Sequence, residues 1–232
     1  MFVLLLLLAY SLPSRGATFF ADTFSTSTLN SASPAPPTTT STAYQLLSSK
    51  TWNPAPSIAA NDLSFGIGAT SSGHIEVQAR FATTPLALTN LGDYLELSVT
   101  FLNTAGLFSQ GGHVGFGLYN SGGVGPLAGG MNGSAVVGTT GVTGGAQGWQ
   151  GYVSRIAYTG GTHRIATRPA QTSTTANNQD LITEGSSSQS YTGAVNLASS
   201  ASTFTQATGS QLTETLRFTL SAAGTFQIDS AL

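Results

Sequence analysis

The stretch "DYLELSVTFL", residues 93–102, decides the fold class, because polar and apolar positions alternate along it from Tyr94 to Phe101. Such a period of two is typical of a β-strand with one face in the core and the other in water. The same pattern recurs in "HIEVQARF" (74–81) and "LTETLRFTLS" (212–221). About ten short strands separated by Gly, Ser, Asn and Pro, without a convincing amphipathic helix, predict an all-β antiparallel sandwich rather than a barrel.

The composition excludes several classes of function. Charged residues make up 7% of the 232 residues, the net charge is -2, and Lys50 is the one lysine. Nucleic-acid binding is disfavoured, because the neutralisation of phosphates requires clustered Lys and Arg. The chain has no cysteine, which excludes disulfides and thiolate metal sites.

The N-terminal run "MFVLLLLLAYSL" has the length of a signal-peptide core and is too short for a comfortable membrane span. Small residues at Ser14 and Gly16 fit a cut after residue 16. We therefore expect a signal peptide over 1–16, one sandwich domain over 17–232 without a membrane span, and a secreted or cell-surface location. A buried first strand or a membrane anchor is the alternative. The strand expected at 225–232 stops abruptly, so we also expect a longer reading frame, with a genuine C-terminal strand as the alternative.

Residues 113–120 form a second informative stretch, which carries a candidate binding face. In "HVGFGLYN" (113–120), one face is apolar, whereas the other carries glycines between a His and a Tyr. Glycine inside a strand often marks the close approach of a ligand or of another backbone. The face is therefore predicted to be a sugar-binding floor or a surface covered by a loop, with residues 120–148 as the expected cover. The predicted ligand-binding residues are His74, Glu76, Gln78, Arg80, Tyr94, Glu96, His113, Gly115, Gly117, Tyr119, Asn120, Trp149 and Arg155.

Five segments carry a resemblance to a known family: "FADTF", "GDYLELSVTFLNT", "HVGFGLYNSGG", "GYVSRIAY" and "LTETLRFTLSAAGTFQIDSAL". In their order they resemble the concanavalin A-like lectin/glucanase jelly roll in its LamG-like form. The chain is also similar to exported bacterial proteins that end in a PEP-CTERM-type sorting signal. The resemblance implies a jelly-roll sandwich, but this fold is shared by lectins, glycosidases and adhesive modules.

The carboxylates of the sequence do not match the family's catalytic motif. Retaining glucanases of this fold carry an E-x-D-x-x-E type pair of carboxylates, and no such motif is present. Glu76 and Glu96 could approach one another if their strands pair, but Arg80 lies on the same face as Glu76, and cross-strand ion pairs, which are common on sheets, are the simpler interpretation. We therefore predict no catalytic residues.

Calcium is the one cofactor that the sequence leaves open. LamG-like domains often hold Ca²⁺, and oxygen donors are available at Asp93 and Asn120, or at Asp22 and Asp229 if the terminal strands pair. The alternative is that these side chains are solvated in turns. No residues are spaced as ligands of a transition metal.

The sequence as a whole predicts a non-catalytic secreted or cell-surface module that binds a glycan or an extracellular-matrix component. The alternatives are a glycan-active enzyme that uses Glu76 and Glu96, and a purely structural surface domain.

Overall fold

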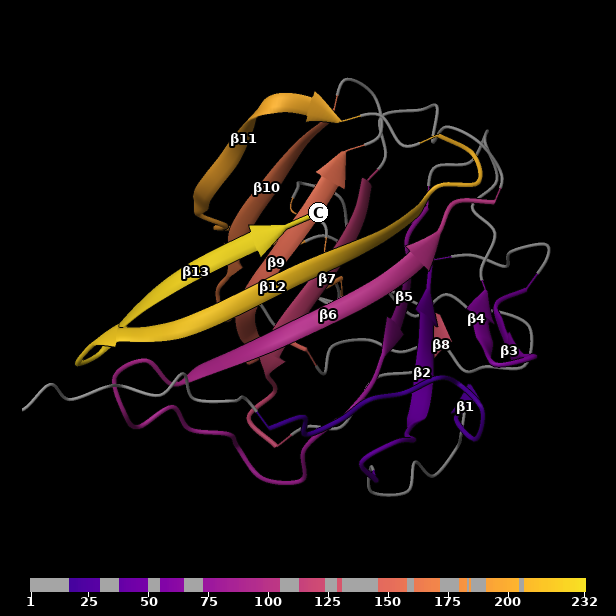
Figure 1. The fold of residues 1–232 in the computed structure, drawn as a ribbon, viewed down its shortest axis with the longest axis horizontal. Coiled ribbons are helices and arrows are strands. Elements are labelled where there is room, and N and C mark those ends of the chain that lie inside the picture. Colours follow the sequence, from indigo (N-terminus) through magenta and orange to yellow (C-terminus); the bar gives the residue numbers. More distant parts are fainter. Residues whose placement is uncertain are drawn as a thin grey trace, which may run out of the picture.

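The described part of the chain consists of β-strands joined by turns, without a helix (Figure 1). The computed structural model describes residues 17–29, 38–49, 55–64, 73–104, 113–123, 129–130, 146–157, 161–171, 180–182, 184, 191–204 and 207–232. The predicted signal peptide therefore lies outside the described residues. The strands are β1 (Thr28–Leu29), β2 (Ala43–Ser48), β3 (Ser57–Ala59), β4 (Asp62–Ser64), β5 (Ile75–Gln78), β6 (Tyr94–Leu102), β7 (His113–Asn120), β8 (Gly129–Gly130), β9 (Gln150–Ala157), β10 (Gly161–Arg168), β11 (Asn196–Phe204), β12 (Gln211–Ala222) and β13 (Thr225–Ala231).

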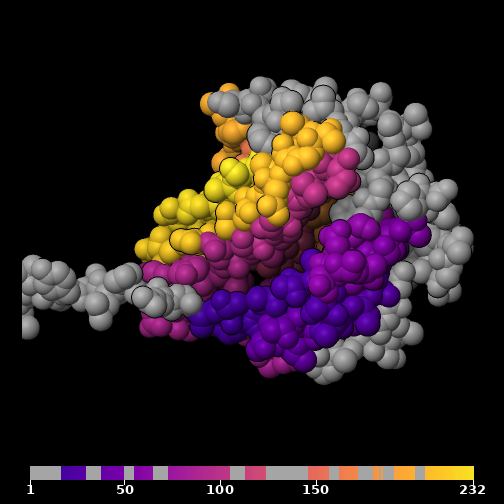
Figure 2. Space-filling model, turned by 45° about the vertical axis from the view of Figure 1, so that its right-hand side comes forward, coloured from indigo at the N-terminus to yellow at the C-terminus, as the bar shows by residue number. Residues whose placement is uncertain are grey.

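Two antiparallel sheets form a sandwich. The first sheet has the order β13-β12-β6 and the second has the order β11-β10-β9-β7, and the strands of the first cross in front of the second in Figure 1. A third sheet, β1-β2-β5, also carries β8 on β2, and β3 and β4 form a separate hairpin. In Figure 2 these N-terminal strands, in indigo and purple, lie beside the magenta β6, and the yellow β12 and β13 lie on the other side of β6. The predicted all-β sandwich is thus confirmed, whereas a jelly-roll order of strands stays a prediction.

The sandwich core is formed by the apolar faces that the alternation predicts. Leu216 and Phe218 of β12 pack against Leu118 of β7 and Ile165 of β10, and all four are buried. Full burial of such a side chain contributes roughly 1.5–3 kcal/mol, so these contacts fix how the two sheets face one another. Partly buried apolar residues pack around this cluster: Phe81, Leu95, Leu97, Tyr152 and Ile228.

The first paired residue is Thr28, which lies opposite Ala43, and residues 18–24 form no strand. One local prediction is wrong. In the 74–81 stretch the strand is shorter than expected and its polar face is the buried one. Glu76 and Gln78 are buried while Val77 is only half-buried, because the polar face of β5 lies against a buried segment of the chain, described below.

Close backbone packing explains Gly151 in β9, which lies directly opposite Tyr119. A Cβ atom at this position would overlap the carbonyl oxygen of Leu118 and the ring of Tyr119. Gly151→Ala is therefore expected to lower the free energy of unfolding by about 1–3 kcal/mol in urea denaturation. Gly148→Ala is the matched control, because a Cβ atom there meets nothing within 4 Å. Equal stability of the two variants would contradict this packing.

Candidate functional site

The structure divides the thirteen predicted ligand-binding residues into three groups. Tyr94 and Glu96 lie on the outer face of the first sheet. The side chains of Arg80 and Asn120 make local hydrogen bonds to the main chain two residues later. The other nine lie around one face of the second sheet and the adjoining strand β5, and we call this region the glycine-lined face. They are His74, Glu76, Gln78, His113, Gly115, Gly117, Tyr119, Trp149 and Arg155.

The glycines of this face are covered. The ring of Tyr119 lies over Gly117, where a Cβ atom would overlap it, and Ile182 occupies the space above Gly115. The Tyr119 hydroxyl donates to the carbonyl of Leu181 at 2.5 Å. Of the two predictions for the face, an open floor or a covered surface, the described residues show the cover. Among the described residues the cover consists of Tyr119 itself and the segment 180–182, and most of 120–148, the expected source, lies outside the described residues.

The segment Asp180–Leu181–Ile182, which we call the 180–182 segment, is fastened by polar contacts. Glu76 Oε1 accepts the amide hydrogen of Leu181 at 2.5 Å, and Glu76 Oε2 accepts from Gln78 Nε2 at 2.9 Å. The carboxylate of Asp180 accepts the amide of Ile182 at 2.8 Å and lies 2.5 Å from His74 Nδ1. Buried main-chain groups of the segment thus find partners on β5 and β7.

Burial shifts the pKa values of this region. The pKa of Glu76 is raised well above its usual value by desolvation, by the charge of Asp180 and by their hydrogen bond. The pKa of His113 is lowered to about 4, first by desolvation and then by the charge of Arg155. Desolvation also raises the pKa of Tyr119 well above its usual value. In this environment Glu76 and His113 favour their neutral forms.

Arg168 is a buried residue of the region that the sequence pattern did not reveal. Its side chain is 1% exposed, donates to the carbonyl of Trp149 at 2.5 Å, and lies 5.4 Å from the ring centre of Tyr191. Its Nε also donates weakly to the carbonyl of Asp180 at 3.5 Å. The sequence has only seven Lys and Arg, nine Asp and Glu and three His. Six of them gather here: His74, Glu76, His113, Arg155, Arg168 and Asp180.

A second polar cluster lies between the two sheets. Ser154 Oγ and Ser230 Oγ each donate to Glu214 Oε1 at 2.5 Å, and His163 Nε2 lies 3.0 Å from the same oxygen. His163 Nε2 is also 2.7 Å from Ser154 Oγ and 2.9 Å from Ser230 Oγ. A nucleophile–base–acid relay needs the serine and the acid on different ring nitrogens. Here both meet Nε2, so the cluster is not a catalytic triad.

The alternation of the sequence contained a signal for this cluster. Glu214 shares its strand face with Leu216 and Phe218, and Ser154 shares its face with Ile156. A polar residue on the strand face whose other residues are apolar indicates a buried polar group. An alternation that is counted on apolar residues alone overlooks the acid that lies among them.

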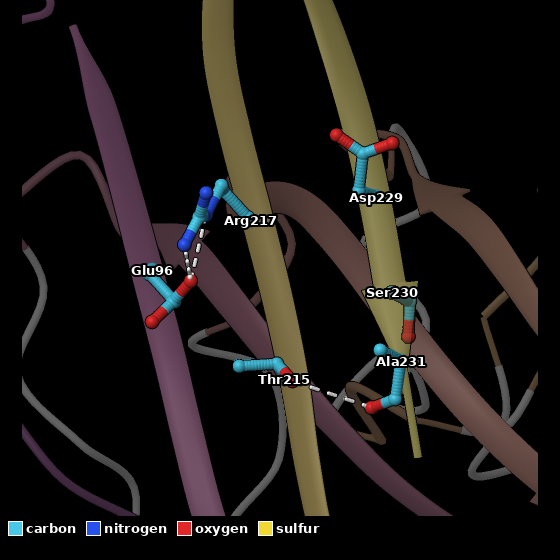
Figure 3. A pocket seen from close by; sticks show the side chains of 6 residues that line it. All are labelled: Glu96, Thr215, Arg217, Asp229, Ser230 and Ala231. Atoms are coloured by element: carbon cyan, nitrogen blue, oxygen red, sulfur yellow. Dashed lines mark hydrogen bonds and ion pairs between the residues drawn. The ribbon is translucent and has the colours of Figure 1, made fainter. Parts of the chain in front are cut away.

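The outer face of the first sheet carries a shallow depression lined by Glu96, Thr215, Arg217, Asp229, Ser230 and Ala231 (Figure 3). Arg217 of β12 lies in register between Glu96 of β6 and Asp229 of β13. Its Nη2 and Nε lie 2.5 and 2.6 Å from Glu96 Oε2, and its guanidinium carbon is 4.5 Å from the ring centre of Tyr94.

The hypothetical pair of Glu76 and Glu96 is wrong, because the two residues belong to different sheets. Strand β5 pairs with β2, whereas β6 pairs with β12. The side chain of Arg80 donates to the carbonyls of Ala82 and Thr83.

The oxygen donors considered for calcium have local roles. Asp93 accepts the amides of Thr89 and Asn90, which lowers its pKa, and Asn120 accepts the amide of Gly122. Asp22 and Asp229 are not joined by a terminal strand pair, because β13 pairs with β12 and Asp22 accepts from the hydroxyl of Tyr44. In the described ranges no three His, Asp or Glu side chains form a group that could hold a metal ion.

Comparison with known proteins gives no relative: no family model, no curated protein and no solved structure matches the chain. The resemblance to LamG-like and PEP-CTERM proteins therefore rests on the sequence pattern alone. Among the described residues, no helix is long and apolar enough to cross a membrane.

Proposed function

We propose that this protein is a non-catalytic β-sandwich module, secreted or held at the cell surface, that binds a neutral carbohydrate on the outer face of β6, β12 and β13. The observation that carries the proposal is the row Glu96–Arg217–Asp229 along the depression in Figure 3. The glycine-lined face offers less support for a ligand site, because Tyr119 and Ile182 occupy the space above its glycines.

The chemistry of the row suits hydroxyl groups. Two carboxylates accept and one guanidinium donates, so that neighbouring hydroxyls of a sugar can be bound in pairs. The guanidinium carbon of Arg217 lies 4.5 Å from the ring centre of Tyr94, and the attraction between cation and ring helps to hold the guanidinium in place. One cation between two anions disfavours an acidic sugar, because its carboxylate would meet Glu96 and Asp229.

The first test is a glycan-array screen followed by a variant at the centre of the row. Arg217→Ala is expected to weaken binding to a captured neutral glycan about tenfold or more, since it removes a charged hydrogen-bond donor. Folding should change little, because exposed ion pairs contribute about 0–1 kcal/mol. Thr100→Ala is the matched control on the same sheet, where the hydroxyl of Thr100 lies 2.8 Å from that of Thr213.

A purely structural surface domain is the second candidate function. It is favoured by the cover of the glycine-lined face. The glycines of β7 are explained if this strand packs only against other parts of its own chain, without a ligand. Failure of the folded wild-type protein to bind any glycan, with or without Ca²⁺, would reject the carbohydrate proposal and leave the structural one. Equal binding by wild type and Arg217→Ala would instead move the ligand site away from this row.

A further inference from the structure

Two arginines lie side by side on the glycine-lined face of the second sheet, and we call Arg155 and Arg164 the arginine pair. Arg155 of β9 lies directly opposite Arg164 of β10, and the row continues to Gly115 of β7 and Ser199 of β11 on the neighbouring strands (Figure 1). Directly opposite residues of an antiparallel sheet point to the same face, with Cβ atoms about 4.5–5.5 Å apart. Like charges at such positions are destabilising. The arginine pair therefore repels itself unless a negative charge lies close to both guanidinium groups.

The same two arginines are those whose guanidinium groups lack a hydrogen-bond acceptor. Three other arginines of the described chain each donate to an oxygen within 3.1 Å: Arg80, Arg168 and Arg217. Arg155 Nη2, by contrast, lies 4.0 Å from Glu184, which is beyond hydrogen-bond distance. Arg164 makes no ion pair and no side-chain hydrogen bond with any residue that the structure describes. An acceptor is thus missing at the one place where two arginines meet.

Arg155 is buried although its donors are not satisfied. The residue is 9% exposed, and its Nε reaches no acceptor among the described residues. A buried charged donor normally has a partner, either in the protein or in a bound molecule. Arg164 beside it is exposed, as is Ser199 on the next strand. A ligand can therefore approach Arg155 from the side of Arg164.

The two guanidinium groups act on a common point, the ring of His113 at the start of β7. The pKa of His113 is lowered to about 4, first by desolvation and then by positive charges that include Arg155 and Arg164. The charge of Asp180 has the opposite effect. Since both arginines influence His113, their charged ends lie in the same region of the glycine-lined face.

We propose that the arginine pair is a binding site for a tetrahedral oxyanion, the sulfate or phosphate group of an ester. A guanidinium group presents a fork of N–H donors, and the two oxygens of a planar carboxylate are occupied by one such fork. A tetrahedral group has at least three free oxygens in different directions, so it can accept from both arginines. Ser199 adds a hydroxyl donor in the same row. The site lies on the other sheet from Arg217, and the proposal does not depend on carbohydrate binding there.

The test is a titration of the full chain with sodium sulfate, sodium phosphate and sodium acetate at constant ionic strength, followed by NMR of the arginine Nε–H groups and of the His113 ring. Sulfate and phosphate are expected to shift the signals of Arg155 and Arg164 saturably. They should also raise the pKa of His113, because they neutralise charge that lowers it. Acetate should bind about tenfold more weakly or less. Glucose 6-sulfate and glucose 6-phosphate identify the ester that is preferred, with glucose as the neutral control.

Arg164→Gln is the deciding variant, because Arg164 is exposed and its substitution leaves the fold intact. It is expected to weaken sulfate binding about tenfold or more, and to raise the pKa of His113 in the absence of sulfate. Arg155→Lys keeps the charge but loses the fork, and should weaken binding as well. Glu184→Gln removes an acid close to Arg155 and should strengthen binding. Arg80→Gln is the matched control, since it removes an exposed arginine that already has carbonyl partners.

Three results would overturn the proposal. The first is that chloride at the same ionic strength causes the same shifts, which would show screening without a site. The second is equal affinity for sulfate in the wild type and in Arg164→Gln. The third is acetate binding as tight as sulfate binding, which would make the site one for carboxylates. Arg217→Gln separates this site from the carbohydrate row: it should leave sulfate binding unchanged, and loss of sulfate binding in this variant would place the oxyanion at Arg217.

Discussion

Glu214→Ala is expected to lower the free energy of unfolding by about 3–5 kcal/mol, because it removes the acceptor at the centre of a buried polar cluster. Ser154 is fully buried and Glu214 is 1% exposed, so water cannot replace the lost carboxylate without entering the core. The hydroxyls of Ser154 and Ser230 and the ring of His163 would all lose the oxygen on which they converge. A buried donor without a partner is destabilising by about 1–3 kcal/mol.

The location of the cluster enlarges the effect. Its residues come from β9, β10, β12 and β13, so it joins the two sheets at one point beside the apolar core. Ser230 lies on β13, which among the described strands pairs only with β12, and its hydroxyl connects that strand to the second sheet. We therefore expect loss of the cluster to loosen β13 as well as to destabilise the domain.

The measurement is urea denaturation of the variant and of two controls. Glu96→Ala removes a glutamate from the exposed ion pair with Arg217 and should change stability by about 1 kcal/mol or less. Glu214→Gln keeps one oxygen for the two hydroxyls and should lie between the wild type and Glu214→Ala. If Glu214→Ala and Glu96→Ala are equally stable, the polar cluster does not hold the sheets together.

The sequence predicted the fold better than the site, and β6 and β5 show why. In β6 the apolar residues face the larger sheet, so alternation alone identified Leu95 and Leu97 as core residues. In β5 the same rule assigned Glu76 to water, although it is buried. Alternation separates the polar side of a strand from its apolar side. It does not show whether the polar side faces water or is covered by another part of the chain.

The cover of the glycine-lined face could not be located for a related reason. The glycines in 113–120 predicted the close approach of a ligand or of another backbone, or a covering loop, and the structure shows side chains against Gly115 and Gly117. Their partners, however, are the ring of Tyr119 and the distant 180–182 segment. Spacing along the chain gives no information on such long-range packing, and Asp180 has no motif that would mark it.

Arg168→Ala is the second substitution with a large expected effect, again about 3–5 kcal/mol of unfolding free energy. The guanidinium is 1% exposed, donates to the carbonyl of Trp149 and lies over the ring of Tyr191. It is also a positive charge close to Glu76 and Asp180. Its removal leaves a buried carbonyl without this donor and a buried acid pair without this cation.

The same strand provides the control, since Arg164 lies four residues earlier on the same face of β10 and is exposed. Arg164→Ala should change stability by no more than about 0.5 kcal/mol.

Arg168→Met tests the origin of the loss, because it restores apolar volume without charge. Replacement of buried ions by apolar groups is often nearly neutral. If Arg168→Met is as stable as the wild type, packing beside Tyr191 is the main contribution of this residue. If it is as unstable as Arg168→Ala, the charge is required, and the acid pair at Glu76 and Asp180 depends on Arg168 for its place in the interior. Wild-type stability in Arg168→Ala itself would contradict both explanations.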